Sequence, residues 1–181
     1  FLPGSRTFSV GSAGCNFQCR FCQNHQTARV PSSGVVSGRR VTPDALVRLA
    51  ENQHARSMAF TYNEPTVFFE LLYETASLAQ AVGLRVILVS NGFMGGDFLL
   101  SLRSRVNAIN VDLKSFSDDF YREYCGGRLQ PVLDNLKLIK RLGWWLEVTT
   151  LVIPGCNDSP AELRDIARFI RERLCVRLPD D

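Results

Sequence analysis

Ser57-Met58-Ala59-Phe60-Thr61-Tyr62-Asn63-Glu64-Pro65 holds the pattern that decides the fold. A short β-rich run over 57–61 passes through small and polar residues to a helix start at Glu64-Pro65. Proline is favoured in the first turn of a helix, because the N–H that it lacks has no partner there. The helix that follows has apolar residues on one face, and Gly83 is placed to end it. The stretch therefore predicts one β-strand followed directly by one helix.

The same order of elements recurs along the whole chain. Helical patterns separate five strand-like runs, which are Thr7–Val10, Ser57–Thr61, Arg85–Val89, Ala108–Leu113 and Leu146–Ile153. Strands separated by helices form a parallel sheet with right-handed crossovers. We therefore expect an α/β fold of five β-α units, with a sheet that is open or curls toward a barrel. The last helix starts at a capping box, Ser159-Pro160-Ala161-Glu162.

Each strand-like run is followed by small and polar residues. The carboxyl ends of parallel strands share one edge of the sheet, and ligands bind at that edge in α/β proteins. We expect a binding site there, built from 11–15, 62–65, 90–92, Asp112 with Lys114, and 154–158.

Six cysteines carry the clearest chemical signal. Three fall in Cys15-Asn16-Phe17-Gln18-Cys19-Arg20-Phe21-Cys22, and we interpret the scattered Cys125, Cys156 and Cys175 as ordinary thiols. Three thiolates on one loop suit a cubane iron–sulfur cluster, because they leave one iron open to a substrate or cofactor. Structural zinc usually takes four ligands on two separated pairs. His25 would complete a Cys3His set, so a zinc-stabilised, non-catalytic α/β binding module is the alternative.

The composition excludes several classes of protein. With 181 residues, 45% of them hydrophobic and 22% charged, the chain has the make-up of a soluble globular domain. The formal charge of +3 is too small to indicate a nucleic-acid partner. No uncharged apolar run approaches about 18 residues. No signal peptide is visible. We therefore expect a cytoplasmic protein with no membrane span.

The cysteine loop resembles the signature of the radical S-adenosylmethionine (SAM) superfamily, and Phe21 supplies its usual aromatic residue before the last cysteine. Tyr62-Asn63-Glu64-Pro65 sits where that superfamily has a Gly-Gly-Glu-type motif. Val111-Asp112-Leu113-Lys114 and 152–158 resemble strand motifs of glycyl-radical-enzyme activases such as pyruvate formate-lyase activating enzyme. Four segments also resemble the radical SAM enzyme of the AmmeMemoRadiSam system: 1–7, 13–17, 62–66 and 125–127.

This resemblance implies a partial (β/α)6 TIM-like barrel with a parallel sheet, of which about five β-α units are present. The superfamily has a sixth unit and a segment before Phe1. We therefore expect residues 1–181 to be a radical SAM core domain that is trimmed at both ends.

The resemblance also implies the roles of individual residues. Cys15, Cys19 and Cys22 would hold three irons of a 4Fe-4S cluster, and the fourth iron would bind the amino and carboxylate groups of SAM. One electron from the cluster would cleave SAM, and the resulting 5′-deoxyadenosyl radical would abstract hydrogen from a substrate. Asp112 and Lys114 are the candidate catalytic residues. The implied SAM contacts are Phe21, Tyr62, Asn63, Glu64, Ser90, Asn91, Asp112, Lys114 and Ile153.

The expected partners follow from this chemistry. They are SAM and a one-electron donor such as flavodoxin or ferredoxin. The chain departs from the activases at Val89, where they have an Asp thought to help bind a monovalent cation, and at Thr149-Thr150, where they have an Arg. Both changes count against a glycyl-radical substrate, which stays one option beside an unknown peptide, protein or small molecule.

Overall fold

The computed structural model describes residues 1–30, 34 and 38–175, and it confirms the expected β-α order. All neighbouring strands pair in parallel, in the order β1-β2-β3-β4-β5. The strands are β1 (Thr7–Val10), β2 (Ser57–Phe60), β3 (Arg85–Ser90), β4 (Ala108–Asp112) and β5 (Trp145–Thr149).

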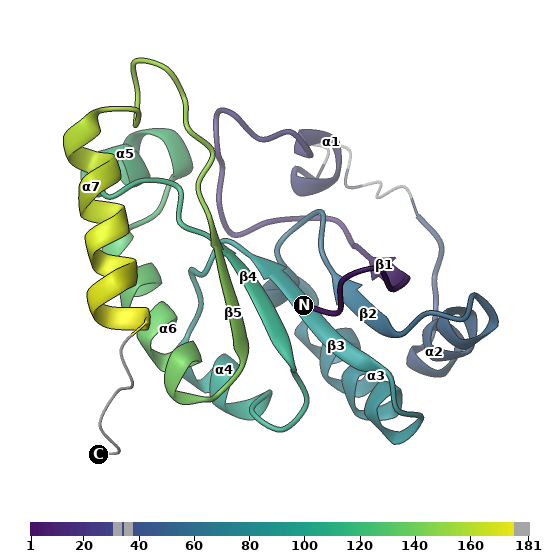
Figure 1. Ribbon diagram of the computed structural model, residues 1–181. Helices are drawn as coiled ribbons and strands as arrows, with labels where there is room; N and C mark the ends of the chain where they lie inside the picture. The colour runs from purple at the N-terminus through teal and green to yellow at the C-terminus, as the bar shows by residue number, and fades with distance from the viewer. Residues whose placement is uncertain (31–33, 35–37, 176–181) are drawn as a thin grey trace.

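Helices follow each strand. The longer ones pack on the outside of the curved sheet, as Figure 1 shows for α3, α6 and α7. None of the helices in the described ranges is both long and apolar enough to cross a membrane. The α-helices are α1 (His25–Ala28), α2 (Pro43–Asn52), α3 (Phe69–Ala81), α4 (Gly96–Ser101), α5 (Asp118–Phe120), α6 (Leu129–Arg141) and α7 (Pro160–Phe169). A 3-10 turn, η1 (Pro65–Phe68), precedes α3, and the π-helical turns η2 (Tyr121–Cys125) and η3 (Ile170–Leu174) extend α5 and α7.

β2, β3 and β4 each end one residue from the expected position, β5 starts one residue earlier, and two expectations differ more clearly from the structure. The fifth strand ends at Thr149 rather than at Ile153, because β4 ends at Asp112 and its last register partner is Thr149. The apolar residues that follow therefore have no strand to pair with and form a loop.

The expected capping box at the start of α7 is only half formed. Ser159 Oγ accepts from the backbone N–H of Glu162 at 3.2 Å, but the Glu162 carboxylate accepts from the backbone N–H of Phe116 at 2.8 Å instead of returning to Ser159.

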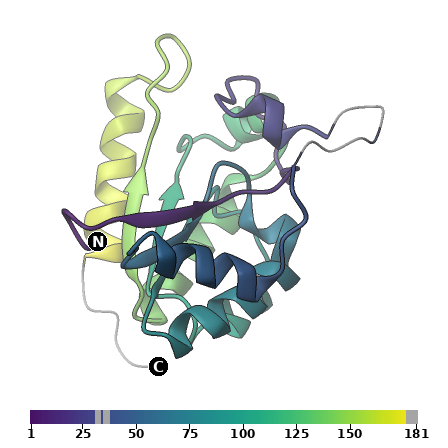
Figure 2. The ribbon, with the colours of Figure 1, turned by 90° about the vertical axis from the view of Figure 1, so that its right-hand side faces the viewer.

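The two faces of the sheet have different environments. Val86 and Leu88 of β3 are fully buried against the helices, where they meet side chains such as Leu72 of α3 and Leu136 of α6. On the opposite face, alternate residues of β4 and β5 stay accessible, because only loops cover that side. Figure 2 shows that the loop after β5 and the segment that carries α1 lie at the same end of the molecule. The carboxyl ends of the strands and their loops therefore surround one region.

Candidate functional site

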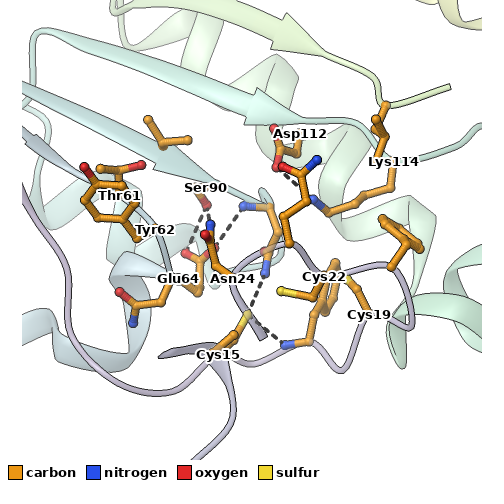
Figure 3. Close-up of a pocket in the computed structure, with 18 of the residues that line it drawn as sticks. Cys15, Cys19, Cys22, Asn24, Thr61, Tyr62, Glu64, Ser90, Asp112 and Lys114 are labelled. Atoms are coloured by element: carbon orange, nitrogen blue, oxygen red, sulfur yellow. Dashed lines mark hydrogen bonds and ion pairs between the residues drawn. The ribbon is translucent and has the colours of Figure 1, made fainter. Parts of the chain in front are cut away.

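A cavity of about 380 Å³ lies at the carboxyl edge of the sheet, within the size range of small-molecule sites. Cys15, Cys19 and Cys22 all line it, and residues from the ends of β2, β3, β4 and β5 complete its wall (Figure 3). Every residue to which the resemblance assigned a cluster or SAM contact borders this cavity except Ile153. Of the strand-end segments expected in the site, 11–14, Pro65, Gly92 and 154–158 do not line it. Because the carboxyl ends of parallel strands share one edge of the sheet, residues that are far apart in sequence meet at this cavity.

Ile153 lies outside the cavity wall. Its side chain packs, partly buried, against the hydrophobic core, and its backbone N–H donates to Asn157 Oδ1 at 2.6 Å. Leu151 lines the cavity instead. This difference follows from the early end of β5, because the loop turns the apolar residues after Thr149 in other directions.

The cysteine loop is held from several sides by backbone hydrogen bonds. Gly14 N–H donates to the Thr27 carbonyl at 2.8 Å, which ties the start of the loop to α1. On the other side, Gln18 N–H donates to the Cys125 carbonyl at 2.8 Å, and Arg20 N–H donates to the Tyr124 carbonyl at 2.9 Å. The loop has no regular secondary structure between β1 and α1, so these contacts define its shape.

Phe17 anchors the middle of the same loop in the protein interior. It is 4% exposed, and its ring lies 5.1 Å from the ring of Phe93 and 6.0 Å from that of Tyr121, centroid to centroid. Gly127 lies against this ring, and a Cβ at position 127 would overlap the ring atoms. The neighbouring Cys15 and Cys19 line the cavity together with Phe17. The end of η2 and Gly127 thus support the cysteine loop through hydrogen bonds and packing.

The thiols have different chemical environments. Burial raises the pKa of Cys15. A hydrogen bond from the buried Cys125 lowers the pKa of Cys19 to about 7, against the effect of burial, and the nearby Lys114 ammonium adds to the lowering. Because the thiolate is the form that binds metals, Cys19 is prepared for ligation near neutral pH.

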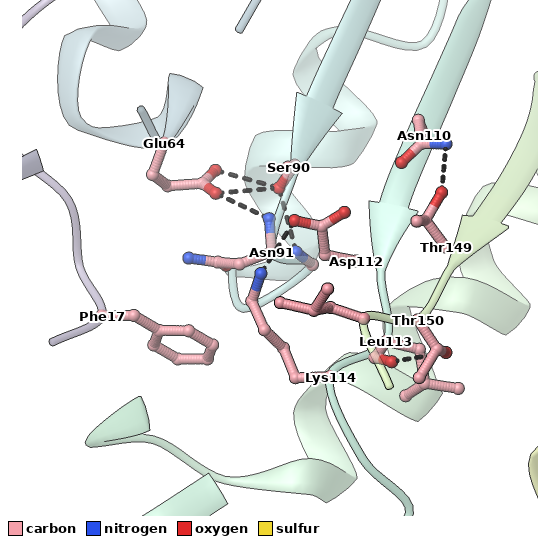
Figure 4. A network of polar contacts seen from close by, with 12 residues as sticks. Phe17, Glu64, Ser90, Asn91, Asn110, Asp112, Leu113, Lys114, Thr149 and Thr150 are labelled. Carbon is pink, nitrogen blue, oxygen red and sulfur yellow. Dashed lines mark hydrogen bonds and ion pairs between the residues drawn. The ribbon is translucent and has the colours of Figure 1, made fainter. Parts of the chain in front are cut away.

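Glu64 is a buried acid at the end of β2. Only 2% of the residue is exposed, and its carboxylate accepts from Ser90 Oγ at 3.0 Å and from the Asn91 N–H at 2.9 Å (Figure 4). Burial raises the pKa of Glu64 to about 7, although these hydrogen bonds oppose the rise. A carboxyl group in this state can accept a cation near neutral pH, and it holds the turn after β3 in place.

Asp112 and Lys114 form an ion pair at the end of β4. Lys114 Nζ lies 2.8 Å from Asp112 Oδ2, and the lysine side chain is 16% exposed (Figure 4). Burial alone would lower the pKa of Lys114, but the attraction of Asp112 and their hydrogen bond raise it. The backbone N–H of Lys114 donates to the Tyr121 hydroxyl at 3.0 Å. The ammonium is therefore a fixed positive charge on the cavity wall.

Asparagine side chains that the sequence did not single out connect the loops of the site. Asn157 is 1% exposed, and its amide donates to the carbonyls of Lys114 at 2.7 Å and Leu151 at 2.9 Å. Asn16 donates to the Phe93 carbonyl at 2.6 Å. Both residues stand inside motifs that were noted for other reasons. Their partners come from other loops, so no local signal could have identified them.

Zinc and a cubane cluster place different requirements on their thiolate ligands. In the described ranges, no three His, Cys, Asp or Glu side chains surround one position that a single metal ion could occupy. A zinc ion binds all its ligands in one sphere, with Zn–S distances of about 2.3 Å. A cubane takes each thiolate on a different iron, so its ligands stand further apart. His25 is exposed on α1. Cys15, Cys19 and Cys22 line one cavity, as the three thiolate ligands of a cubane would.

Comparison with known proteins identifies relatives along almost the whole chain. Residues 9–170 match the family model described as "Radical SAM superfamily". An uncharacterized protein of Methanocaldococcus jannaschii is 36% identical over 179 residues, which cover 99% of this chain and 53% of that protein. A pyruvate formate-lyase-activating enzyme of Clostridium pasteurianum is 22% identical over 175 residues, covering 93% of this chain and 71% of that enzyme. The chain thus spans about half the length of the Methanocaldococcus relative.

Solved structures share the fold. Streptococcus suis SuiB, in a crystal structure with bound S-adenosylmethionine, superposes with a TM-score of 0.73 at 14% identity, covering 92% of this chain and 38% of SuiB. A domain of a pyruvate-formate lyase-activating enzyme from Bacteroides vulgatus superposes with a TM-score of 0.60 at 15% identity, covering 65% of this chain and 73% of that domain. At these identities the likeness concerns the arrangement of strands and helices, and the expected partial barrel is confirmed.

Proposed function

The chain belongs to the radical SAM superfamily and is distantly related to glycyl-radical-enzyme activases, and from this we propose that its cavity binds a 4Fe-4S cluster and SAM. One observation carries the proposal. The three clustered cysteines, the buried Glu64 and the Lys114 ammonium border a single cavity of about 380 Å³. The cavity thus offers the Glu64 carboxylate to the amino group of SAM and the Lys114 ammonium to its carboxylate.

The cysteines would be the cluster ligands. Cys15, Cys19 and Cys22 would each bind one iron and leave the fourth iron facing the cavity. When bound and reduced, such a cluster supplies one electron to the sulfonium of SAM, which then yields methionine and a 5′-deoxyadenosyl radical. The backbone contacts from the Cys125 segment would keep the loop in place around it.

The charged side chains would orient SAM by matching its charges. The carboxylate of Glu64 would accept hydrogen bonds from the amino group of SAM, and Lys114 would face its carboxylate, as charge-assisted hydrogen bonds favour. Asp112 would hold Lys114 in this position through their 2.8 Å ion pair. The backbone N–H of Asn91 and the hydroxyl of Ser90 would hold the carboxylate of Glu64 from the other side. These contacts would exclude water from the charged end of SAM.

The remaining wall would accommodate the adenosyl group and the substrate. Phe21 and Tyr62 offer aromatic surface for the adenine ring. Thr149 and Thr150 line the side next to β5, and no charged side chain from that strand end reaches the cavity wall. We propose an unidentified peptide, protein or small molecule as substrate, and a flavodoxin or ferredoxin as electron donor.

Spectroscopy of the reconstituted protein tests this function. Full-length protein loaded anaerobically with iron and sulfide should be brown, with broad absorption across the visible range. The electron paramagnetic resonance spectrum of its reduced form should change when SAM is added, because SAM binds the open iron. A colourless protein that retains zinc would support the binding-module alternative. A brown protein whose electron paramagnetic resonance spectrum does not change when SAM is added would indicate a cluster used only for electron transfer.

A further inference from the structure

Asn63 borders the cavity, and its side chain is hydrogen-bonded to the start of the cysteine loop. The residue is 7% exposed, so its amide must find partners within the protein. Its Oδ1 accepts from the backbone N–H of Ser12 at 2.9 Å, and its Nδ2 donates to the Gly14 carbonyl at 2.8 Å. Both ends of one amide are thus engaged by the two residues that flank Ala13.

These bonds act directly in front of the first cysteine. Gly14 has a φ of +100°, a conformation that few other residues adopt, and its own N–H donates to the Thr27 carbonyl at 2.8 Å. The peptide units on both sides of Gly14 are therefore fixed. Asn63 holds the one that follows Gly14, and Thr27 of α1 holds the one that precedes it. Cys15 follows without any intervening residue, so its position depends on this anchor.

A second anchor lies on the other side of Cys15. Asn91 Nδ2 donates to Asn16 Oδ1 at 2.7 Å and lies 3.8 Å from Cys15 Sγ, and Asn16 Nδ2 donates to the Phe93 carbonyl at 2.6 Å. The end of β2 thus holds the residue before Cys15, and the end of β3 holds the residue after it.

We propose that Asn63 is a positioning residue that holds the cysteine loop in the conformation that accepts the cluster, before the cluster binds. This inference rests on the cluster assignment made above, and it gives Asn63 a role different from contact with SAM. An irregular loop loses conformational entropy when it closes around a ligand, and prior anchoring removes part of that cost. Asn63 would therefore govern cluster loading, while Glu64 beside it serves SAM.

Hydrogen exchange of the apoprotein tests the anchor without any cluster. Asn63→Ala removes both bonds, and each typically contributes enough that exchange across 12–22 should become about 10- to 100-fold faster. Asn63→Asp keeps an acceptor for Ser12 but places a carboxylate opposite the Gly14 carbonyl. It should preserve protection at Ser12. Repulsion between the two oxygens should loosen the Gly14 peptide unit, so exchange should become faster at Gly14, whose N–H donates to the Thr27 carbonyl, and at Cys15. Asn107→Asp is the matched control. The Oδ1 atom of the Asn107 side chain accepts from the backbone N–H of Val86 at the opposite end of the strands, far from the cysteine loop.

Cluster loading then separates positioning from SAM contact. After limited reconstitution, both Asn63 variants should contain less iron than the wild type. The fraction that carries a cluster should bind SAM with unchanged affinity by calorimetry. Weaker SAM binding with normal iron loading would overturn the proposal, and so would unchanged exchange across 12–22 in Asn63→Ala. Wild-type protein that binds no iron would instead refute the proposed function, and the exchange result would still decide whether Asn63 anchors the loop.

Discussion

Cys19→Ala is expected to reduce the iron content of the reconstituted protein from about four atoms per chain, the content of one cubane, to nearly none. Cys19 is the middle ligand of the proposed set, and its pKa of about 7 makes it the thiol prepared for ligation near neutral pH. Two remaining thiolates on a short loop cannot enclose the cluster. Iron and sulfide assays after anaerobic reconstitution, together with visible absorption, measure the loss.

Cys175→Ala provides the matched control. This cysteine is exposed after η3 and does not border the cavity. Its replacement should leave iron content and colour close to those of the wild type. If Cys175→Ala bleached the protein while Cys19→Ala loaded normally, the ligand assignment would be wrong.

Glu64→Gln is expected to remove most of the pH dependence of SAM binding between pH 6 and pH 8. The pKa of Glu64 is raised to about 7 by burial, so the wild-type side chain is largely neutral at pH 6 and largely anionic at pH 8. A carboxylate accepts hydrogen bonds from the amino group of SAM better than a neutral carboxyl does, and wild-type SAM affinity should therefore rise with pH across this range. Loss of a charged partner typically costs about 1.5–3 kcal/mol, so Glu64→Gln should bind SAM roughly 10- to 100-fold more weakly at pH 8.

The same group makes the stability of the apoprotein depend on pH. Between its ordinary pKa of 4.5 and about 7, Glu64 binds more protons in the folded than in the unfolded state. The free energy of unfolding should therefore fall by up to about 3 kcal/mol as pH rises through this window. Denaturant titrations at several pH values should show that Glu64→Gln lacks this fall. Glu51→Gln, at an exposed position on α2, should retain it. A wild type without the fall would show that Glu64 stays ionised.

The fold could be predicted because its signals are local. Each strand-like run and each longer helical pattern is visible in its own stretch of consecutive residues, and parallel strands place their polar carboxyl ends together. The three-plus-two cysteine spacing is equally local. These two features were enough to predict that Cys15, Glu64 and Lys114 share one site, and all three border the same cavity.

The remaining features depend on contacts across the sheet. The end of β5 at Thr149 is set by the length of β4, and the apolar residues after it look the same in a strand or a loop. Glu162 has the sequence of a capping box, but the 115–116 turn offers its carboxylate better donors. The partners of Asn63 lie some 50 positions earlier in the chain. No window of sequence reveals such pairings.

Formation of 5′-deoxyadenosine by the full-length protein tests the central claim most directly. Reconstituted protein should be reduced with dithionite in the absence of oxygen, mixed with SAM, and assayed by chromatography for 5′-deoxyadenosine and methionine. We expect both products in equal amounts from the wild type, and neither from Cys19→Ala. Wild-type protein that carries about four irons, binds SAM and still forms no 5′-deoxyadenosine would contradict the account.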